Sequence, residues 1–196
     1  MPLNDMVSFI AVELDDHLSA SHIGLGILLS YTMYKLSRVP DWQRVLRKEV
    51  LTLAERSDQS WAHRLVNLPV LDSVVTENMR TRVPCPIPFP RAVPDSGCRL
   101  VGKYDAPRGT VVSSSARALH FNELPFPSSE KWRPGRWLEV DEATKAEMLK
   151  WIRTFGSDAR VCIGTHFSMR GRSHPVTIPD VRFIEERADD TNENQW

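Results

Sequence analysis

The chain has 196 residues, and its 25 basic and 25 acidic side chains leave no net formal charge. Hydrophobic residues make up 41% of the sequence, which is typical of a globular protein, and the balanced charge excludes the basic footprint of a nucleic-acid-binding protein. The three cysteines form no C-x-x-C pair and have no histidine at zinc-finger spacing, which argues against a disulfide framework or structural zinc. The longest apolar stretch, 23–34, is short for a membrane span, and no secretory signal precedes it, so we expect a cytoplasmic chain as given.

Helical periodicity marks the N-terminal half of the chain. Leucines spaced by three or four residues, or by multiples of these, predict one long helix over 5–37, which Pro40 interrupts. A second helix is predicted with Pro40 in its first turn and an apolar stripe behind it. A third helix begins near Pro69 and carries LDSVVTENMR, in which Glu77 and Arg80 lie three residues apart on one face. Such a pair is usually a surface salt bridge of small energetic value.

The next part of the chain carries signals for extended structure. PCPIPFPRAVP has a proline at every second position from Pro84 to Pro90, which fixes φ and forbids a helix or a central strand. GCRLVGKY and GTVVSSS, on either side of the turn-like DAPRG, predict short strands of one small sheet. EKWRPGRWLEV is irregular, and DEATKAEMLKWIRTF predicts a further helix. The expected fold class is therefore mainly α with a small β-sheet.

The loop FGSDARVCIG contains the third cysteine, Cys162. A lone cysteine between apolar neighbours such as Val161 and Ile163 often behaves as a small buried hydrophobe. Arg160 precedes the sulfur by two residues, however, and a helix opening at THFSMR would place the sulfur near a helix N-terminus. Both features stabilise a thiolate. The residues alone leave two interpretations open, a buried apolar side chain and an anionic sulfur ligand.

Four motifs follow one another along the chain: E-x-x-R on a helix, the proline-rich arm, W-R-P-G-R-W, and F-x-x-x-x-R-x-C-x-G. In this order, over 14–170, the chain resembles the C-terminal haem-binding half of the cytochrome P-450 superfamily, and in particular a fungal-type enzyme of secondary metabolism. The resemblance implies a haem-thiolate monooxygenase that binds haem b and receives electrons from NADPH through a separate cytochrome reductase. It also implies oxidation of an apolar organic substrate with dioxygen, and an endoplasmic reticulum membrane location for a complete member.

The resemblance also implies roles for individual residues. Cys162 would be the axial ligand of the haem iron. The cofactor-binding residues around the haem would be Arg91, Phe155, Gly156, Arg160 and Gly164. The two arginines would pair with the haem propionates, because a planar guanidinium suits a carboxylate. Glu77, Arg80 and Arg136 would form a buried triad that supports folding rather than chemistry.

Several positions depart from the family pattern. Ile23, Gly24 and Leu25 stand where the long distal helix of the family carries an acid and hydroxyl groups, so no catalytic residue is assigned and impaired proton delivery is expected. Asp158 replaces a glycine of the cysteine loop. Gly135 replaces the glutamate of the P-E-R segment, which removes one carboxylate near Arg136.

Members of the family are much longer and supply most of the substrate pocket from upstream sequence, so the resemblance implies a truncated enzyme, here of two parts. Residues 1–170 are expected to form a partial haem-thiolate domain, and residues 171–196 a divergent, poorly ordered tail without its own match. Two alternative functions remain. In the first, the chain is a non-catalytic remnant that acts as an interaction module through exposed apolar surface. In the second, it is a haem-thiolate isomerase or dehydratase, which needs neither dioxygen nor the missing acid and hydroxyl groups.

Overall fold

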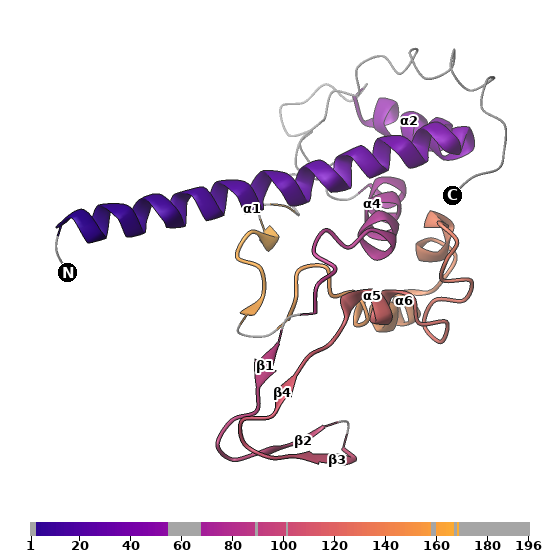
Figure 1. The fold of residues 1–196 in the computed structure, drawn as a ribbon. Coiled ribbons are helices and arrows are strands. Elements are labelled where there is room, and N and C mark those ends of the chain that lie inside the picture. Colours follow the sequence, from indigo (N-terminus) through magenta and orange to yellow (C-terminus); the bar gives the residue numbers. More distant parts are fainter. Residues whose placement is uncertain are drawn as a thin grey trace, which may run out of the picture.

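The computed structural model describes residues 3–54, 68–88, 90–100, 102–157, 160–166 and 168. Within these ranges the chain is mainly helical, as the sequence predicts (Figure 1). The helices are α1 (Leu3–Arg38), α2 (Pro40–Ala54), α4 (Pro69–Thr81), α5 (Ala116–His120), α6 (Glu142–Leu149) and the 3-10 helix η1 (Pro134–Trp137). The strands are β1 (Arg91–Ala92), β2 (Cys98–Leu100), β3 (Tyr104–Ala106) and β4 (Val111–Val112). The expected tail, 171–196, lies outside the described residues.

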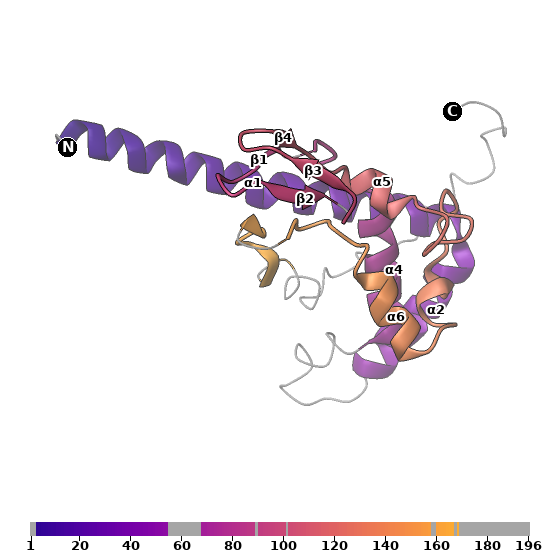
Figure 2. The same cartoon turned by 90° about the horizontal axis from the view of Figure 1, so that it is seen from below.

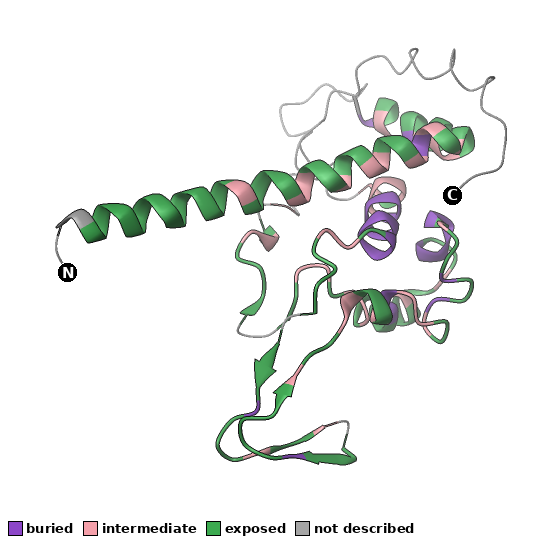
Figure 3. Cartoon of the chain, in the orientation of Figure 1, coloured by how far each residue is buried: buried purple, intermediate pink, exposed green. Residues whose placement is uncertain are grey.

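Helix α1 is a rod of 36 residues that meets the other helices near its C-terminal end. There Leu36 is only 7% exposed, whereas Leu14 and Leu18 are 60% and 66% exposed. Figures 1 and 2 show the N-terminal half of the rod extending past the other described elements, and Figure 3 shows the exposed residues along it. The leucine periodicity therefore predicts the helix, but only its C-terminal part joins a core among the described residues. No described helix is both long and apolar enough to cross a membrane.

A first hydrophobic core joins α1, α2 and α4. Leu36, Leu46 and Val74 are buried at its centre, and burial of such side chains contributes about 1.5–3 kcal/mol each. Helix α4 begins after Leu68, which offers no side-chain acceptor for the first free N–H groups. The Glu49 carboxylate on α2 supplies that acceptor instead. It receives hydrogen bonds from the backbone N–H groups of Val70 and Leu71 at 2.9 and 3.0 Å, so α2 caps α4.

The strands form two separate antiparallel pairs rather than the single sheet that the sequence suggested. Strands β1 and β4 pair with Arg91 opposite Val112, and β2 and β3 pair with Arg99 opposite Asp105. Two features separate the pairs. Pro94 has no N–H to continue a ladder, and the chain turns there, with the Gly97 N–H bound to the Pro94 carbonyl at 2.9 Å and φ of +69° at Gly97.

The C-terminal part of the described chain has a second core of Phe126, Trp137 and Met148. Helix α6 starts at the Asp141 cap, whose carboxylate accepts from the Thr144 N–H at 2.7 Å, and ends at Leu149. The predicted helix was longer. After Leu149 the backbone changes to hydrogen bonds of the 3-10 type, from an N–H to the carbonyl three residues earlier, and Trp151 and Ile152 pack against the second core. Helix α5 was not predicted; Ser115 caps it by accepting from the Ala118 N–H at 3.3 Å.

Candidate functional site

A buried ionic cluster lies at the centre of the described chain. Glu77 and Arg80, on α4, have no exposed surface, and Arg136, on η1, is 5% exposed. Arg80 binds the Glu77 carboxylate through two nitrogens, Nε at 2.9 Å and Nη2 at 2.8 Å. Arg136 donates from Nε to the same carboxylate at 3.2 Å. The pair is thus not the surface salt bridge that its spacing alone suggested, and the structure brings all three residues of the expected triad together.

The remaining donors of the two guanidinium groups meet backbone carbonyls. Arg80 donates to the carbonyl oxygens of His120 and Lys131 at 2.8 and 3.3 Å. Arg136 donates to the carbonyl oxygens of Pro127, Ser128 and Lys131 at 3.0, 3.3 and 3.2 Å. Burial lowers the pKa of Arg136 from its ordinary value, whereas the neighbouring Glu77 carboxylate raises it. These bonds draw the segment 120–137 onto α4, which is a folding role.

Residues 153–157 and 160–166, here called the cysteine segment, are held by backbone hydrogen bonds. The Cys162 N–H donates to the Phe155 carbonyl at 2.8 Å, and the Thr165 N–H and hydroxyl donate to the Cys162 carbonyl at 3.1 and 2.6 Å. Gly156 turns the chain with φ of +76°. Thr165, His166 and Ser168 are helical, so the cysteine comes just before the start of a helix. In Figures 1 and 2 this segment, orange to yellow, lies close to the middle of α1.

The Cys162 side chain is exposed, as are Val161 and Ile163 at 47% and 82%. The interpretation of Cys162 as a small buried hydrophobe is therefore wrong. Cys85 and Cys98 are exposed as well, so exposure alone does not distinguish Cys162. Its distinction is its place between a glycine turn and a helix start.

The other residues expected around the cofactor lie in this segment or on β1. Phe155 and Gly164 are half-buried, and Gly156 and Arg160 are exposed. Arg91, on β1, is exposed and donates from Nη1 to the Pro90 carbonyl at 3.0 Å. Within the described residues, neither Arg91 nor Arg160 pairs with a carboxylate, so both guanidiniums are available to an anionic ligand. Asp158 lies outside the described residues.

The stretch of α1 that should handle dioxygen carries no acid or hydroxyl at 23–25. Ile23 is 52% exposed, and a Cβ on Gly24 would lie 3.8 Å from the Pro84 Cβ. Directly before this stretch, the Ser21 hydroxyl and His22 Nδ1 both lie 2.8 Å from the Leu18 carbonyl. The nearest polar side chains on the helix are thus bound to its own backbone.

Two polar residues that bridge the cluster to other elements were missed by the sequence analysis. Asn78 accepts from the Trp132 indole N–H at 2.6 Å and donates to the Thr32 hydroxyl at 2.7 Å. These bonds connect α4 to the chain just before η1 and to α1. His120 has no exposed surface and contacts Arg80 and Arg153. A lone histidine at the end of a five-residue helix carries no motif, so only the folded contacts identify it.

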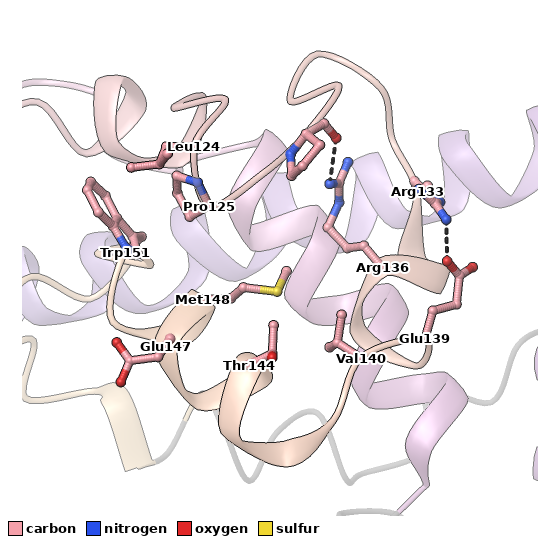
Figure 4. A pocket seen from close by; sticks show the side chains of 11 residues that line it. Leu124, Pro125, Arg133, Arg136, Glu139, Val140, Thr144, Glu147, Met148 and Trp151 are labelled. Atoms are coloured by element: carbon pink, nitrogen blue, oxygen red, sulfur yellow. Dashed lines mark hydrogen bonds and ion pairs between the residues drawn. The ribbon is translucent and has the colours of Figure 1, made fainter.

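A hollow beside the second core is lined by Pro125, Arg136, Val140, Met148 and Trp151, among others (Figure 4). Figure 4 also shows Arg133 pointing to Glu139, with which it forms an ion pair. Neither Cys162 nor any residue assigned to the cofactor lines this hollow. It is therefore separate from the cysteine segment.

The fold and the cysteine segment together define a chain of the cytochrome P450 class, and comparison with known families agrees: the Cytochrome P450 family model matches residues 9–171. The chain belongs to this family. It is 33% identical over 164 residues to a cytochrome P450 monooxygenase of Aspergillus terreus, covering 81% of this chain. It is 33% identical to the cytochrome P450 monooxygenases hkm5 of Aspergillus hancockii and avaI of Aspergillus versicolor, covering 83% and 85% of this chain.

The matched region makes up only part of each relative. It covers 33%, 31% and 43% of the three proteins, so the chain spans less than half the length of the curated relatives it matches. All three relatives are named as monooxygenases, and the family assignment implies haem, a redox partner and a hydrophobic substrate.

The side chains of the cysteine segment fit a haem group chemically. The described residues contain no cluster of three or more His, Cys, Asp or Glu side chains that could hold a bare metal ion. A single exposed thiol can nevertheless complete the coordination of an iron whose other ligands come from a porphyrin. The guanidiniums of Arg91 and Arg160 are exposed and pair with no carboxylate of the described residues, and they are the groups that porphyrin carboxylates would need.

Proposed function

We propose that the chain forms the thiolate-ligand side of a haem-dependent monooxygenase. The observation that carries the proposal is the place of Cys162, an exposed thiol between the Gly156 turn and a helix start, within a chain of the cytochrome P450 family. Cys162 would be the residue that binds the haem iron, and the nearby helix start would favour its thiolate form. When bound, haem b supplies the iron that activates dioxygen, and the thiolate donates electron density to that iron.

The surrounding residues would hold the cofactor. Arg91 and Arg160 would pair with its carboxylates, and Phe155 would shield the sulfur from water. Gly156 and Gly164 allow the backbone to turn close to the haem. Glu77, Arg80 and Arg136 hold the segment 120–137 against α4 and take no part in the reaction. Electrons come from NADPH through a reductase, and the substrate is an apolar organic molecule.

Proton delivery in this chain is weak. Ile23, Gly24 and Leu25 offer no side-chain proton donor, and Ser21 and His22 are bound to the Leu18 carbonyl. A haem-thiolate isomerase or dehydratase, which needs no proton relay to dioxygen, is therefore the second candidate function. Reductase dependence distinguishes the two, because the isomerase or dehydratase would turn over without NADPH.

Reconstitution with haem tests the proposal. The purified chain with added haem should give the thiolate-type Soret band of the reduced, carbon-monoxide-bound state, and Cys162→Ala should abolish that band. Cys98→Ala is the matched control, because Cys98 is also exposed but lies on β2. The control should keep the wild-type band. An identical spectrum in wild type and Cys162→Ala would refute the ligand assignment, and no haem binding in the wild type would favour the non-catalytic interaction module.

A further inference from the structure

His120 connects α4 to Arg153, at the start of the cysteine segment. Its ring Nδ1 lies 3.0 Å from the Arg80 carbonyl oxygen, at the C-terminal end of α4. Its Nε2 lies 2.7 Å from the backbone nitrogen of Arg153. Its own carbonyl accepts from Arg80 Nη1 at 2.8 Å. The ring is fully buried, so these contacts are shielded from competition with water.

The two ring contacts fix the tautomer. The Arg153 N–H is a donor, so His120 Nε2 must carry a lone pair. The hydrogen of the neutral ring is then on Nδ1, where it donates to the Arg80 carbonyl. If Nε2 were also protonated, its N–H would face the Arg153 N–H, and the hydrogen bond between them would be lost. The bridge therefore exists only with neutral His120.

The hydrogen bonds continue from Arg153 to the cysteine. The Arg153 carbonyl accepts from the Gly156 N–H at 3.1 Å, which closes the glycine turn, and the Phe155 carbonyl accepts from the Cys162 N–H at 2.8 Å. The Thr154 hydroxyl adds a weaker contact to α4, donating to the Met79 carbonyl at 3.2 Å. The residues that hold the Cys162 amide are thus anchored to α4 at two adjacent positions.

We propose that His120 is a positioning residue, whose neutral ring fixes the start of the cysteine segment against α4 and so sets the orientation of the Cys162 thiol. It touches no reacting atom and acts through Arg153 and Phe155. The consequence for haem ligation rests on the proposed function, whereas the anchoring of the segment does not.

The surroundings keep the ring neutral under ordinary conditions. Burial lowers the pKa of His120 to about 4, and the nearby charges of Arg80 on α4 and Arg153 on the cysteine segment act in the same direction, while the Arg80 carbonyl opposes them. Glu77 is bound to Arg80 and does not contact the ring. Because the folded pKa lies below the unfolded value of 6.5, the bridge is intact at neutral pH and is lost as pH falls through about 4.

Hydrogen exchange of the full, haem-free chain tests the anchoring. His120→Phe fills the space of the ring without its nitrogens. Relative to intrinsic rates, it should speed exchange of the amides in 153–162 by roughly tenfold or more at pH 7, because two hydrogen bonds are lost. Thr154→Val is the matched control, because it removes the neighbouring hydroxyl bond and leaves the histidine bridge. Its effect should stay below roughly threefold. Wild-type exchange rates in His120→Phe would overturn the proposal.

The wild-type chain supplies a second test, which does not depend on the variant folding. Between pH 6 and pH 3, exchange in 153–162, corrected for intrinsic rates, should accelerate more than in α2, and His120→Phe should lack this selective response. Equal acceleration everywhere, or none, would contradict the bridge. In haem-loaded protein, His120→Phe should convert part of the thiolate-type carbonyl band to a thiol-type band. If wild type shows no thiolate-type band, the proposed function fails, and the exchange result still decides the anchoring role.

Discussion

The Glu77 carboxylate uses both of its oxygens fully. Oε1 accepts from Arg80 Nη2, Arg136 Nε and the Arg133 N–H at 2.8, 3.2 and 2.9 Å. Oε2 accepts from Arg80 Nε and the Trp137 indole at 2.9 and 3.0 Å. Hydrogen bonds to a charged group are roughly twice as strong as neutral ones. A neutral glutamine amide therefore cannot replace the Glu77 carboxylate. Its NH₂ group would face N–H donors and could not accept hydrogen bonds from them.

We accordingly expect Glu77→Gln to lower the free energy of unfolding by about 3–5 kcal/mol, because it leaves two buried guanidiniums without a counter-charge. Urea unfolding followed by circular dichroism measures this. Glu139→Gln is the control: Glu139 pairs with Arg133, but both side chains are more than half exposed, so the loss should stay within about 1 kcal/mol. Similar losses in the two variants would mean that the buried cluster does not hold α4 and η1 together.

At the scale of single elements, η1 carries a glycine, Gly135, beside the carboxylate of a residue four positions later. A Cβ on Gly135 would lie 2.6 Å from Glu139 Oε1 and 3.6 Å from Trp42 Cζ2. The space of a side chain at 135 is thus occupied by the Glu139 carboxylate, which forms an ion pair with Arg133. From the sequence alone, Gly135 predicts the loss of one carboxylate near Arg136. The structure shows another carboxylate beside that glycine.

This arrangement predicts coupling between the two positions. Gly135→Glu should cost about 0.5–1 kcal/mol more with Glu139 in place than in the Glu139→Ala background, because the first case crowds two like charges and displaces Glu139 from Arg133. A double-mutant cycle of urea unfolding energies measures the difference. Pairing Gly135→Glu with Glu142→Ala, an exposed change on α6, provides the control. Additive costs in the first pair would show that the carboxylates do not share the site.

Over the whole molecule, the described elements gather around the C-terminal half of α1. The N-terminal half exposes large apolar side chains, including Phe9, Ile10, Val12, Leu14 and Leu18. No described element packs there (Figures 1 and 3). A substrate beside this part of α1 would meet one wall only, and well-formed binding sites bury most of their ligand. We therefore expect this chain alone to position a substrate weakly, in addition to the weak proton delivery proposed above.

Coupled monooxygenation should therefore be poor. With haem, reductase and NADPH, the chain should yield roughly one product or fewer per hundred NADPH consumed across a panel of apolar substrates, because general acid catalysis alone is worth about 10²–10⁴-fold. The other electrons should appear as hydrogen peroxide, measured in the same assay. Ile23→Glu with Gly24→Thr should shift electrons from peroxide to product. Ser19→Thr on the same helix is the control. Efficient coupling by the wild-type chain would contradict the inference from 23–25.

The sequence predicts the parts of the fold that depend on local pattern. Leucine spacing, Pro40 and Pro69 mark the starts and course of α1, α2 and α4, because a proline in a first turn and a 3.6-residue period act over a few residues. The end of α6 was not predictable in the same way. It is set by the packing of Trp151 and Ile152 on residues far along the chain, which no local pattern records.

The same contrast between local pattern and long-range contact applies to the residues of the candidate site. Cys162, Glu77 and Arg136 were found because their motifs are short and ordered along the chain. His120 and Asn78 were missed, since their partners stand 33 to 54 residues away and their residue types are ordinary in loops and helices. Sequence reasoning therefore locates the residues that carry a motif, and contacts are needed for those that hold them in place.

Glu77 and Arg136 are 59 residues apart in the sequence, so they are synthesised at different times. Ribosomes add about 5–20 residues per second, so Arg136 is made roughly 3–12 s after Glu77. During that interval Glu77 has only Arg80 as a charged partner from this cluster, and Trp137 has not yet been synthesised. Until Arg136 is synthesised, Glu77 and the apolar residues near it on α4 lack part of the structure that covers them in the folded chain. That interval is when a newborn chain would benefit most from a chaperone, and slow codons between 81 and 136 would lengthen it.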